Sequence, residues 1–134
     1  MKKGEAIGIG LLWVLLVTAG CQIVPPGFSQ TAGNIGSAFA AAETTLRYAH
    51  EGKITYAYAA SSFASYQSEL SGNDQTLVSA QGAPSSASMH SLLALYQEAM
   101  QVVNAPCLSA ACNWQRQVAS LDRASQAFLK AGNA

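Results

Sequence analysis

The chain has 134 residues, half of them hydrophobic and only a tenth charged, and its acidic and basic side chains balance to no formal net charge. Two of its seven lysine and arginine residues are Lys2 and Lys3 at the start of the chain, and the other five are widely scattered. A protein that binds nucleic acid needs such residues clustered against the phosphates. The composition therefore excludes a nucleic-acid partner, and the length allows one domain with a core of its own.

The first 20 residues have the pattern of a secretory signal peptide. Lys2 and Lys3 supply positive charge, and the apolar run 7–20 has the length of the hydrophobic region of such a leader. A bilayer-spanning helix needs about 20 apolar residues, so a permanent anchor would require the two lysines to snorkel. Cleavage after the small residues 18–20 to release a secreted product is the other open alternative.

The leader ends in Val17-Thr18-Ala19-Gly20-Cys21, which resembles the lipobox of bacterial lipoproteins. In that class the chain is cut before the cysteine, and the thiol of the new first residue carries a diacylglyceryl group. The resemblance thus implies a signal peptide at 1–20 and lipidation of Cys21, with two or more acyl chains such as palmitate holding the protein stably on a membrane. Gln22 after the cysteine implies sorting to the outer membrane, facing the periplasm, in a Gram-negative host.

The segment from Cys21 to Gly33 is predicted to be the lipidated residue and a flexible tether. It contains Pro25-Pro26-Gly27 and shows no apolar periodicity. Fully extended, residues 22–33 would reach about 40 Å. We therefore expect the folded domain, residues 34–134, to lie close to the membrane surface.

The remainder of the chain predicts an all-α fold, a small antiparallel bundle of four helical segments. Apolar residues recur at helical spacing in four places, and no segment shows sustained strand alternation. Asn34 is a candidate cap for the first helix, and the third apolar stripe is wide enough to predict the most buried helix. The four stripes occupy residues 35–49, 56–70, 89–103 and 114–129. Leu77 and Val78 could add a helical turn between the second and third.

The boundary between the first two segments is ambiguous. A 4-3 spacing that is apolar except at Lys53 and Gln67 continues from Ile35 to Leu70, and one interior glycine costs only about 1 kcal/mol relative to alanine. One long helix is therefore an alternative. We favour a turn, because Gly52 suits a left-handed C-terminal cap, His50 suits the last turn of a helix, and Thr55 suits a new N-terminal cap.

Cys107 and Cys112 lie between the third and fourth segments. An exported chain meets an oxidising compartment, so a structural disulfide is favoured over a redox-active pair or a metal site. Cysteines five residues apart cannot meet on a straight α-helix, since a bridge needs Cα atoms closer than about 7 Å. The chain is therefore predicted to bend between these segments.

Residues for catalysis are sparse. His50 and His90 are the only histidines, and neither belongs to a helical metal-binding pattern. His50 is interpreted as a helix-end residue and His90 as an exposed first-turn residue. There is no nucleophile motif and no glycine-rich phosphate loop in the mature chain. We therefore expect no enzyme activity, no metal and no cofactor.

The tyrosines divide into two groups. Tyr56, Tyr66 and Tyr96 fall on apolar stripes and are predicted to be core residues. Tyr48 and Tyr58 fall instead among polar and small residues. Exposed tyrosines are frequent in interfaces, so Tyr48 and Tyr58 are the candidate contacts with a partner.

These observations lead to two hypotheses of different classes. The first is a lipid-anchored cell-envelope protein that acts non-catalytically by binding another protein, as an accessory component of an envelope or secretion assembly. The alternative is a bundle that binds a small ligand or a cell-wall glycan. A cavity with convergent polar groups would favour the alternative, and a closed core with an exposed aromatic face would favour the first.

The leader generates the first testable prediction. Replacing Cys21 with Ser removes the thiol that the lipobox would alkylate, so the variant should lose acyl-chain labelling while the wild type is labelled. Metabolic labelling with an alkyne fatty acid, followed by membrane fractionation, measures this. A wild type that is unlabelled and fractionates as soluble would refute the lipoprotein interpretation.

Overall fold

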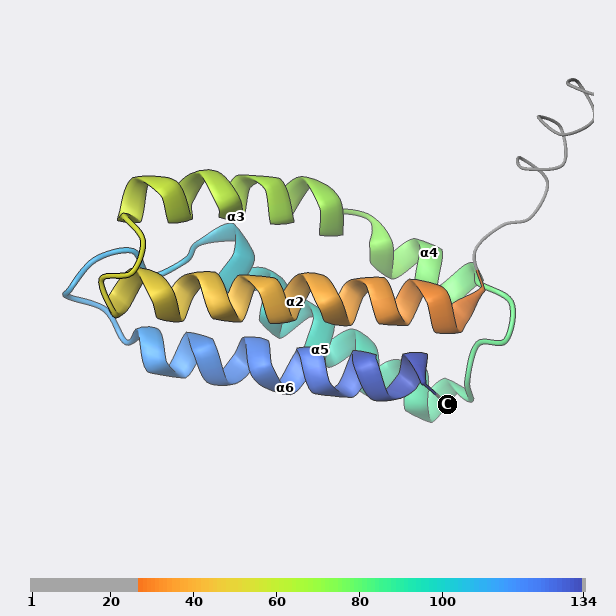
Figure 1. Ribbon diagram of the computed structural model, residues 1–134. Coiled ribbons are helices and arrows are strands. Elements are labelled where there is room, and N and C mark those ends of the chain that lie inside the picture. Colours follow the sequence, from red (N-terminus) through yellow and green to blue (C-terminus); the bar gives the residue numbers. More distant parts are fainter. Residues whose placement is uncertain (1–26, 134) are drawn as a thin grey trace, which may run out of the picture.

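The computed structural model describes residues 27–133 (Figure 1). It contains five helices and, within these residues, no strand: α2 (Phe28–His50), α3 (Tyr56–Leu70), α4 (Asn73–Ser79), α5 (Ser86–Asn104) and α6 (Trp114–Gly132). The four long helices pack on one another and α4 is a short insertion, so the predicted all-α bundle is confirmed. The leader, Cys21 and the first part of the tether lie outside the described residues.

The long helices are arranged as two hairpins. α2 and α3 run antiparallel, as do α5 and α6, and α2 lies between α3 and α6 in the view of Figure 1. α6 runs antiparallel to α2 along most of its length, and α5 closes the bundle against α3 and α6. Both hairpins therefore contribute to one core.

The first helix begins earlier than predicted. Its cap is Gly27, with extended backbone (φ −74°, ψ 171°), and Asn34 is an exposed residue inside the helix. The apolar residues Phe28, Ala32 and Ile35 are all buried and follow helical spacing. The small and polar residues between them concealed this stripe, so assigning residues 28–33 to the tether was wrong.

The turn between α2 and α3 is confirmed. Gly52 has φ 75°, its amide donates to the carbonyl of Ala49 (3.3 Å), and the next amide, of Lys53, donates to the carbonyl of Tyr48 (2.9 Å). These two bonds are those of a Schellman cap, which leaves few carbonyls of the last turn unpaired. The Thr55 hydroxyl then accepts a hydrogen bond from the amide of Tyr58 (3.0 Å) and caps α3.

The predicted additional turn near Leu77 is present as α4. Leu77 is completely buried, whereas Val78 is exposed. The break between α3 and α4 is covered by Tyr96 of α5, whose hydroxyl donates to the carbonyl of Leu70. Burial raises the pKa of the Tyr96 phenol, and the nearby Asp74 carboxylate adds to the effect.

The most buried helix is α2, not the third predicted helix, which corresponds to α5. Leu93, Leu95 and Met100 of α5 are only partly buried, because the wide stripe of that helix extends beyond its contacts with α3 and α6. α2 is instead covered by α3, α4 and α6. Its Phe39 ring packs against Phe128 of α6, with ring centroids 6.1 Å apart.

Glycines allow α2 and α6 to approach closely. A Cβ atom at Gly36 would lie 2.8 Å from both the amide nitrogen and the Cγ of Leu129. A Cβ at Gly132 would lie 2.9 Å from the amide nitrogen of Gly33. Real Cβ atoms essentially never come this near to backbone, so alanine at either position would separate the helices. A Cβ atom added at Gly33, in contrast, would have no neighbouring atom within 4 Å.

This packing generates the second prediction, with Gly33→Ala as the matched control for Gly36→Ala. Both changes add one methyl group to the same helix and bring the same gain in helix propensity, which cancels in the comparison. Only the Gly36 methyl meets the backbone of Leu129. Gly36→Ala should therefore be less stable than Gly33→Ala by about 1–3 kcal/mol. Urea unfolding followed by circular dichroism measures the difference, and equal stability would refute the close packing.

Candidate functional site

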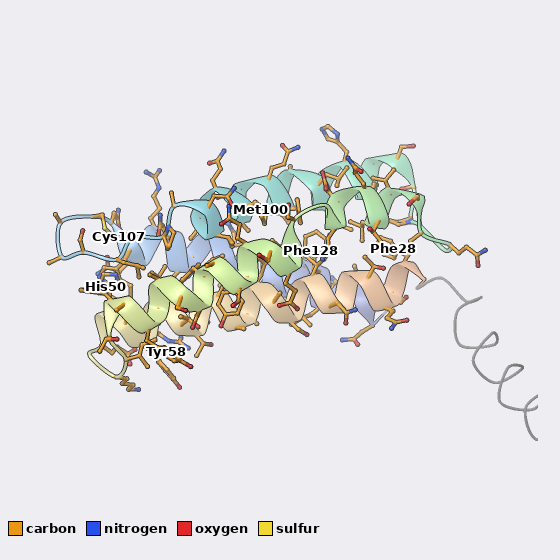
Figure 2. All side chains as sticks on the ribbon, turned by 90° about the horizontal axis from the view of Figure 1, so that it is seen from above. Phe28, His50, Tyr58, Met100, Cys107 and Phe128 are labelled. Carbon is orange, nitrogen blue, oxygen red and sulfur yellow. A yellow bond between two sulfur atoms is a disulfide. The ribbon has the colours of Figure 1, made fainter. Side chains whose placement is uncertain are left out.

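The candidate partner contacts lie at the end of the bundle that is opposite to Gly27. Figure 2 labels Phe28 at one end of the molecule and His50, Tyr58 and Cys107 at the other. Between the two ends runs α2, whose 23 residues span about 35 Å at 1.5 Å per residue. The α2–α3 turn and the disulfide loop therefore meet far from the point where residues 1–26 join the domain.

His50 joins these two segments. Its Nε2 atom lies 2.6 Å from the carbonyl oxygen of Cys107, 57 residues away in sequence. Its ring stacks on Trp114, with centroids 4.6 Å apart and planes 3° from parallel, and meets the edge of Tyr56 at 5.4 Å. A carbonyl can only accept, so Nε2 carries a proton, and Nδ1 lies 3.4 Å from the Tyr56 hydroxyl.

His50 thus lies in the last turn of α2, as predicted, but its contacts exceed those of a helix-end residue. Trp114 was assigned to the apolar stripe of the fourth helix and is only half-buried at the start of α6. No local pattern predicts this stack, because the residues that form it come from three different helices. His90, in contrast, is exposed near the start of α5 as expected.

The tyrosines follow the predictions with one exception. Tyr96 is buried, and Tyr66 packs partly buried against the core with its hydroxyl 2.9 Å from that of Thr45. Tyr56 was predicted to be core and is 40% exposed. It is the first residue of α3, where the apolar stripe runs beyond the core, and its ring packs on His50 instead.

Tyr48 and Tyr58 are exposed, at 38% and 63% of their surface, as the sequence indicated. Tyr48 lies in the last turn of α2 and Tyr58 in the first turn of α3, so the α2–α3 turn brings both to the same end of the bundle. Their rings do not pair with each other. Together with Tyr56, they are the exposed tyrosines at this end of the bundle, and we name these three residues the tyrosine corner (Tyr48, Tyr56 and Tyr58).

Charged groups at the tyrosine corner are paired among themselves. The Lys53 ammonium lies 3.0 Å from a Glu51 carboxylate oxygen and 4.6 Å from the centre of the Tyr48 ring. Arg47 lies 3.1 Å from Glu43 on the adjacent turn. Glu69 is the one charged residue of α3. Glu43, Arg47, Glu51 and Lys53 balance to no net charge, so the surface combines exposed aromatic rings with paired charges.

Cys107 and Cys112 form the predicted disulfide, with Cα atoms 5.9 Å apart, in a loop that bends the chain between α5 and α6. Gln117 of α6 holds this loop from inside. Its Oε1 accepts from the Cys107 amide (2.7 Å) and its Nε2 donates to the Ala105 carbonyl (3.1 Å). Sequence reasoning missed Gln117, since a glutamine on a helix gives no signal that it bonds a loop.

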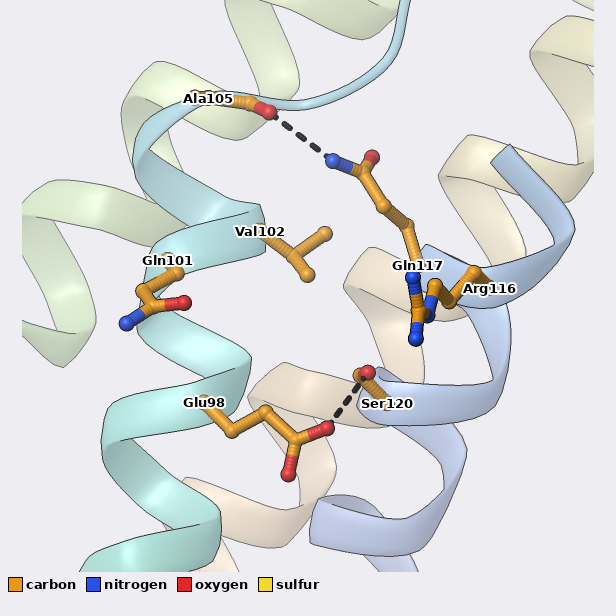
Figure 3. A pocket seen from close by; sticks show the side chains of 7 residues that line it. All are labelled: Glu98, Gln101, Val102, Ala105, Arg116, Gln117 and Ser120. Carbon is orange, nitrogen blue, oxygen red and sulfur yellow. Dashed lines mark hydrogen bonds between the residues drawn. The ribbon is translucent and has the colours of Figure 1, made fainter. Parts of the chain in front are cut away.

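A polar groove lies beside the loop, between α5 and α6 (Figure 3). It has a volume of about 430 Å³ and is lined by Glu98, Gln101, Val102, Ala105, Arg116, Gln117 and Ser120. The Glu98 carboxylate accepts from the hydroxyl of Ser120 (2.9 Å) and the guanidinium of Arg123 (2.6 Å). These two hydrogen bonds lower the pKa of the Glu98 carboxyl, so it is ionised at neutral pH and lacks the raised pKa of a general acid.

The third prediction concerns the disulfide loop. Replacing Cys107 and Cys112 with Ser should lower the free energy of unfolding by about 2 kcal/mol, because the short closed loop no longer restricts the unfolded chain. Thiol-specific mass tagging of the denatured, unreduced wild type should modify neither cysteine. Recovery of the wild type from the envelope with both thiols reactive would contradict the bridge.

Within residues 27–133, no helix is long and apolar enough to cross a membrane, and no cluster of three or more His, Cys, Asp or Glu side chains could hold a metal ion. Comparison with protein-family models, with curated proteins and with solved structures gives no match for this chain.

Proposed function

We propose that this chain is a lipid-anchored cell-envelope protein that acts non-catalytically, by binding another protein through the tyrosine corner. The lipobox-like sequence that ends at Cys21 supports the anchor. An accessory role in an envelope or secretion assembly suits a small bundle of this kind, and Gln22 favours the periplasmic face of the outer membrane in a Gram-negative host.

The observation that carries the proposal is the position of the exposed aromatic side chains at one end of the bundle. Four large hydrophobic side chains are exposed in the described part of the chain, and three of them are Tyr48, Tyr56 and Tyr58. Tyrosine supplies a large contact area with few rotatable bonds to immobilise, which makes it effective in interfaces. The core behind these rings is closed, since Leu46 and Ala59 are completely buried.

The position of the tyrosine corner fits an anchored protein. The described chain begins at Gly27, six residues after Cys21, and the tyrosine corner lies about 35 Å away at the other end of α2. A domain attached by its N-terminal end can thus present these rings away from the lipid. They are accessible to a partner that is not itself at the membrane surface.

A second candidate function is binding of a small ligand or a cell-wall glycan, supported by the polar groove between α5 and α6. Gln101 and Arg116 lie on opposite sides of this groove, with the apolar side chain of Val102 between them in the view of Figure 3. The other polar groups that line it are already bonded: Glu98 to Ser120 and Arg123, and Gln117 to the disulfide loop. The groove therefore offers fewer free groups than a specific ligand site needs.

The fourth prediction tests the tyrosine corner with the double change Tyr48→Ser and Tyr58→Ser. Both rings are exposed, so the free energy of unfolding should fall by no more than about 1 kcal/mol, part of it from the lost contact with Lys53. Binding to the partner should weaken about tenfold or more, as expected for two interface tyrosines. In vivo cross-linking, followed by identification of the attached protein, provides the partner for this measurement.

Val78→Ser is the matched control, because Val78 is the one exposed large hydrophobic residue of the described chain outside the tyrosine corner. It should retain full binding. If the double variant folds normally and keeps every partner, the tyrosine corner is not the binding surface. If a purified glycan fragment binds and Arg116→Ala abolishes its binding, the second candidate function replaces the first.

A further inference from the structure

An apolar groove opens at the end of the bundle where the described chain begins. It has a volume of about 420 Å³ and lies between the first residue of α2, the start of α5 and the end of α6. Its lining consists mainly of apolar side chains, with two serines and one lysine among them: Phe28, Pro84, Ser88, Ser91, Leu92, Leu95, Ala127, Lys130 and Ala131. None of the residues that line this groove belongs to the tyrosine corner.

The residue at which the preceding segment joins the domain is fixed beside this groove. The amide of Phe28 donates to the carbonyl of Gln81 (2.8 Å), and the hydroxyl of Thr31 donates to the carbonyl of Gly27 (3.1 Å). The ring of Phe28, which is 5% exposed, forms one wall. The four residues that come before Gly27 therefore start next to an apolar surface.

The length of that segment matches the groove. The α5 wall extends from Ser88 to Leu95, which is about 10 Å along the helix, or three extended residues. Ile23 lies five residues before Phe28, a reach of up to about 17 Å. The run Ile23–Pro26 can thus cover the groove without any change in α2.

The chemistry of the segment matches as well. Ile23, Val24, Pro25 and Pro26 are all apolar, and the two prolines have no backbone amide that would be left unpaired against an apolar wall. We propose that Ile23–Pro26 dock in the groove between α5 and α6 and cover Leu92 and Leu95. The tether is then fixed rather than free. If Cys21 is lipidated, as in the proposed function, docking holds this end of the bundle against the membrane.

Site-specific photo-cross-linking in the full-length protein tests the docking. A photoreactive phenylalanine analogue replaces Ile23, and the same analogue at the exposed Gln30 of α2 is the control. Irradiation of Ile23 should give intramolecular products that map by mass spectrometry to residues 88–95 and 127–131. The Gln30 control should give none there.

Two groove variants complete the design. Leu95→Lys places a charge on the wall, and Ser88→Trp fills the groove from an exposed position that should not affect folding. Each should lower the yield of the intramolecular product about tenfold, while circular dichroism verifies the fold. Products formed with lipid or with other proteins instead of the groove, or a yield that neither variant changes, would overturn the proposal. Cys21→Ser tests the docking proposal separately from the lipoprotein proposal. Loss of the lipid should leave the cross-link between residue 23 and the groove intact.

Discussion

The rest of the structure depends on the close contact between α2 and α6. Gly36 lies against Leu129 so tightly that even a methyl group would be 2.8 Å from a backbone nitrogen, and Gly132 meets Gly33 in the same way. This contact fixes the spacing of the two helices along their length. Phe39 and Phe128 then face each other, and Tyr96 of α5 completes an aromatic core with centroids 5.9 and 6.4 Å from those two rings. Helices α3 and α5 pack around a pair whose geometry is already determined.

The same contact relates the two ends of the molecule. Because α2 and α6 run antiparallel, the end of α2 lies beside the start of α6, and His50 can stack on Trp114. At the opposite end, the start of α2 lies beside the end of α6, so Phe28 and Ala131 line one groove. An aromatic surface and an apolar groove thus lie at opposite ends of a rigid pair of helices, which would separate a partner contact from the membrane attachment in our proposals.

The parts of the fold that the sequence predicts are those with local causes. Gly52 and Thr55 carry the turn chemistry that ends one helix and begins the next, and the cysteine spacing requires a bend in the chain. The sequence-based predictions are wrong where contacts between residues far apart in the chain determine the structure. At the start of α2, the Phe28 amide bonds the carbonyl of Gln81 and its side chain is buried in the core. Tyr56 is exposed because it lies at the end of the bundle. The contact of His50 with Cys107 joins residues 57 apart and has no local signal.

The distribution of polar groups bears on the kind of function that we propose. Glu98 is engaged by Ser120 and Arg123, Lys53 by Glu51, and both ring nitrogens of His50 by neighbouring groups. Within residues 27–133, every buried side-chain nitrogen or oxygen atom has a hydrogen-bond partner. Tyr48 and Tyr58, in contrast, leave 38% and 63% of their surface exposed, and removing this aromatic surface from water is what would favour the contact with another protein that we propose.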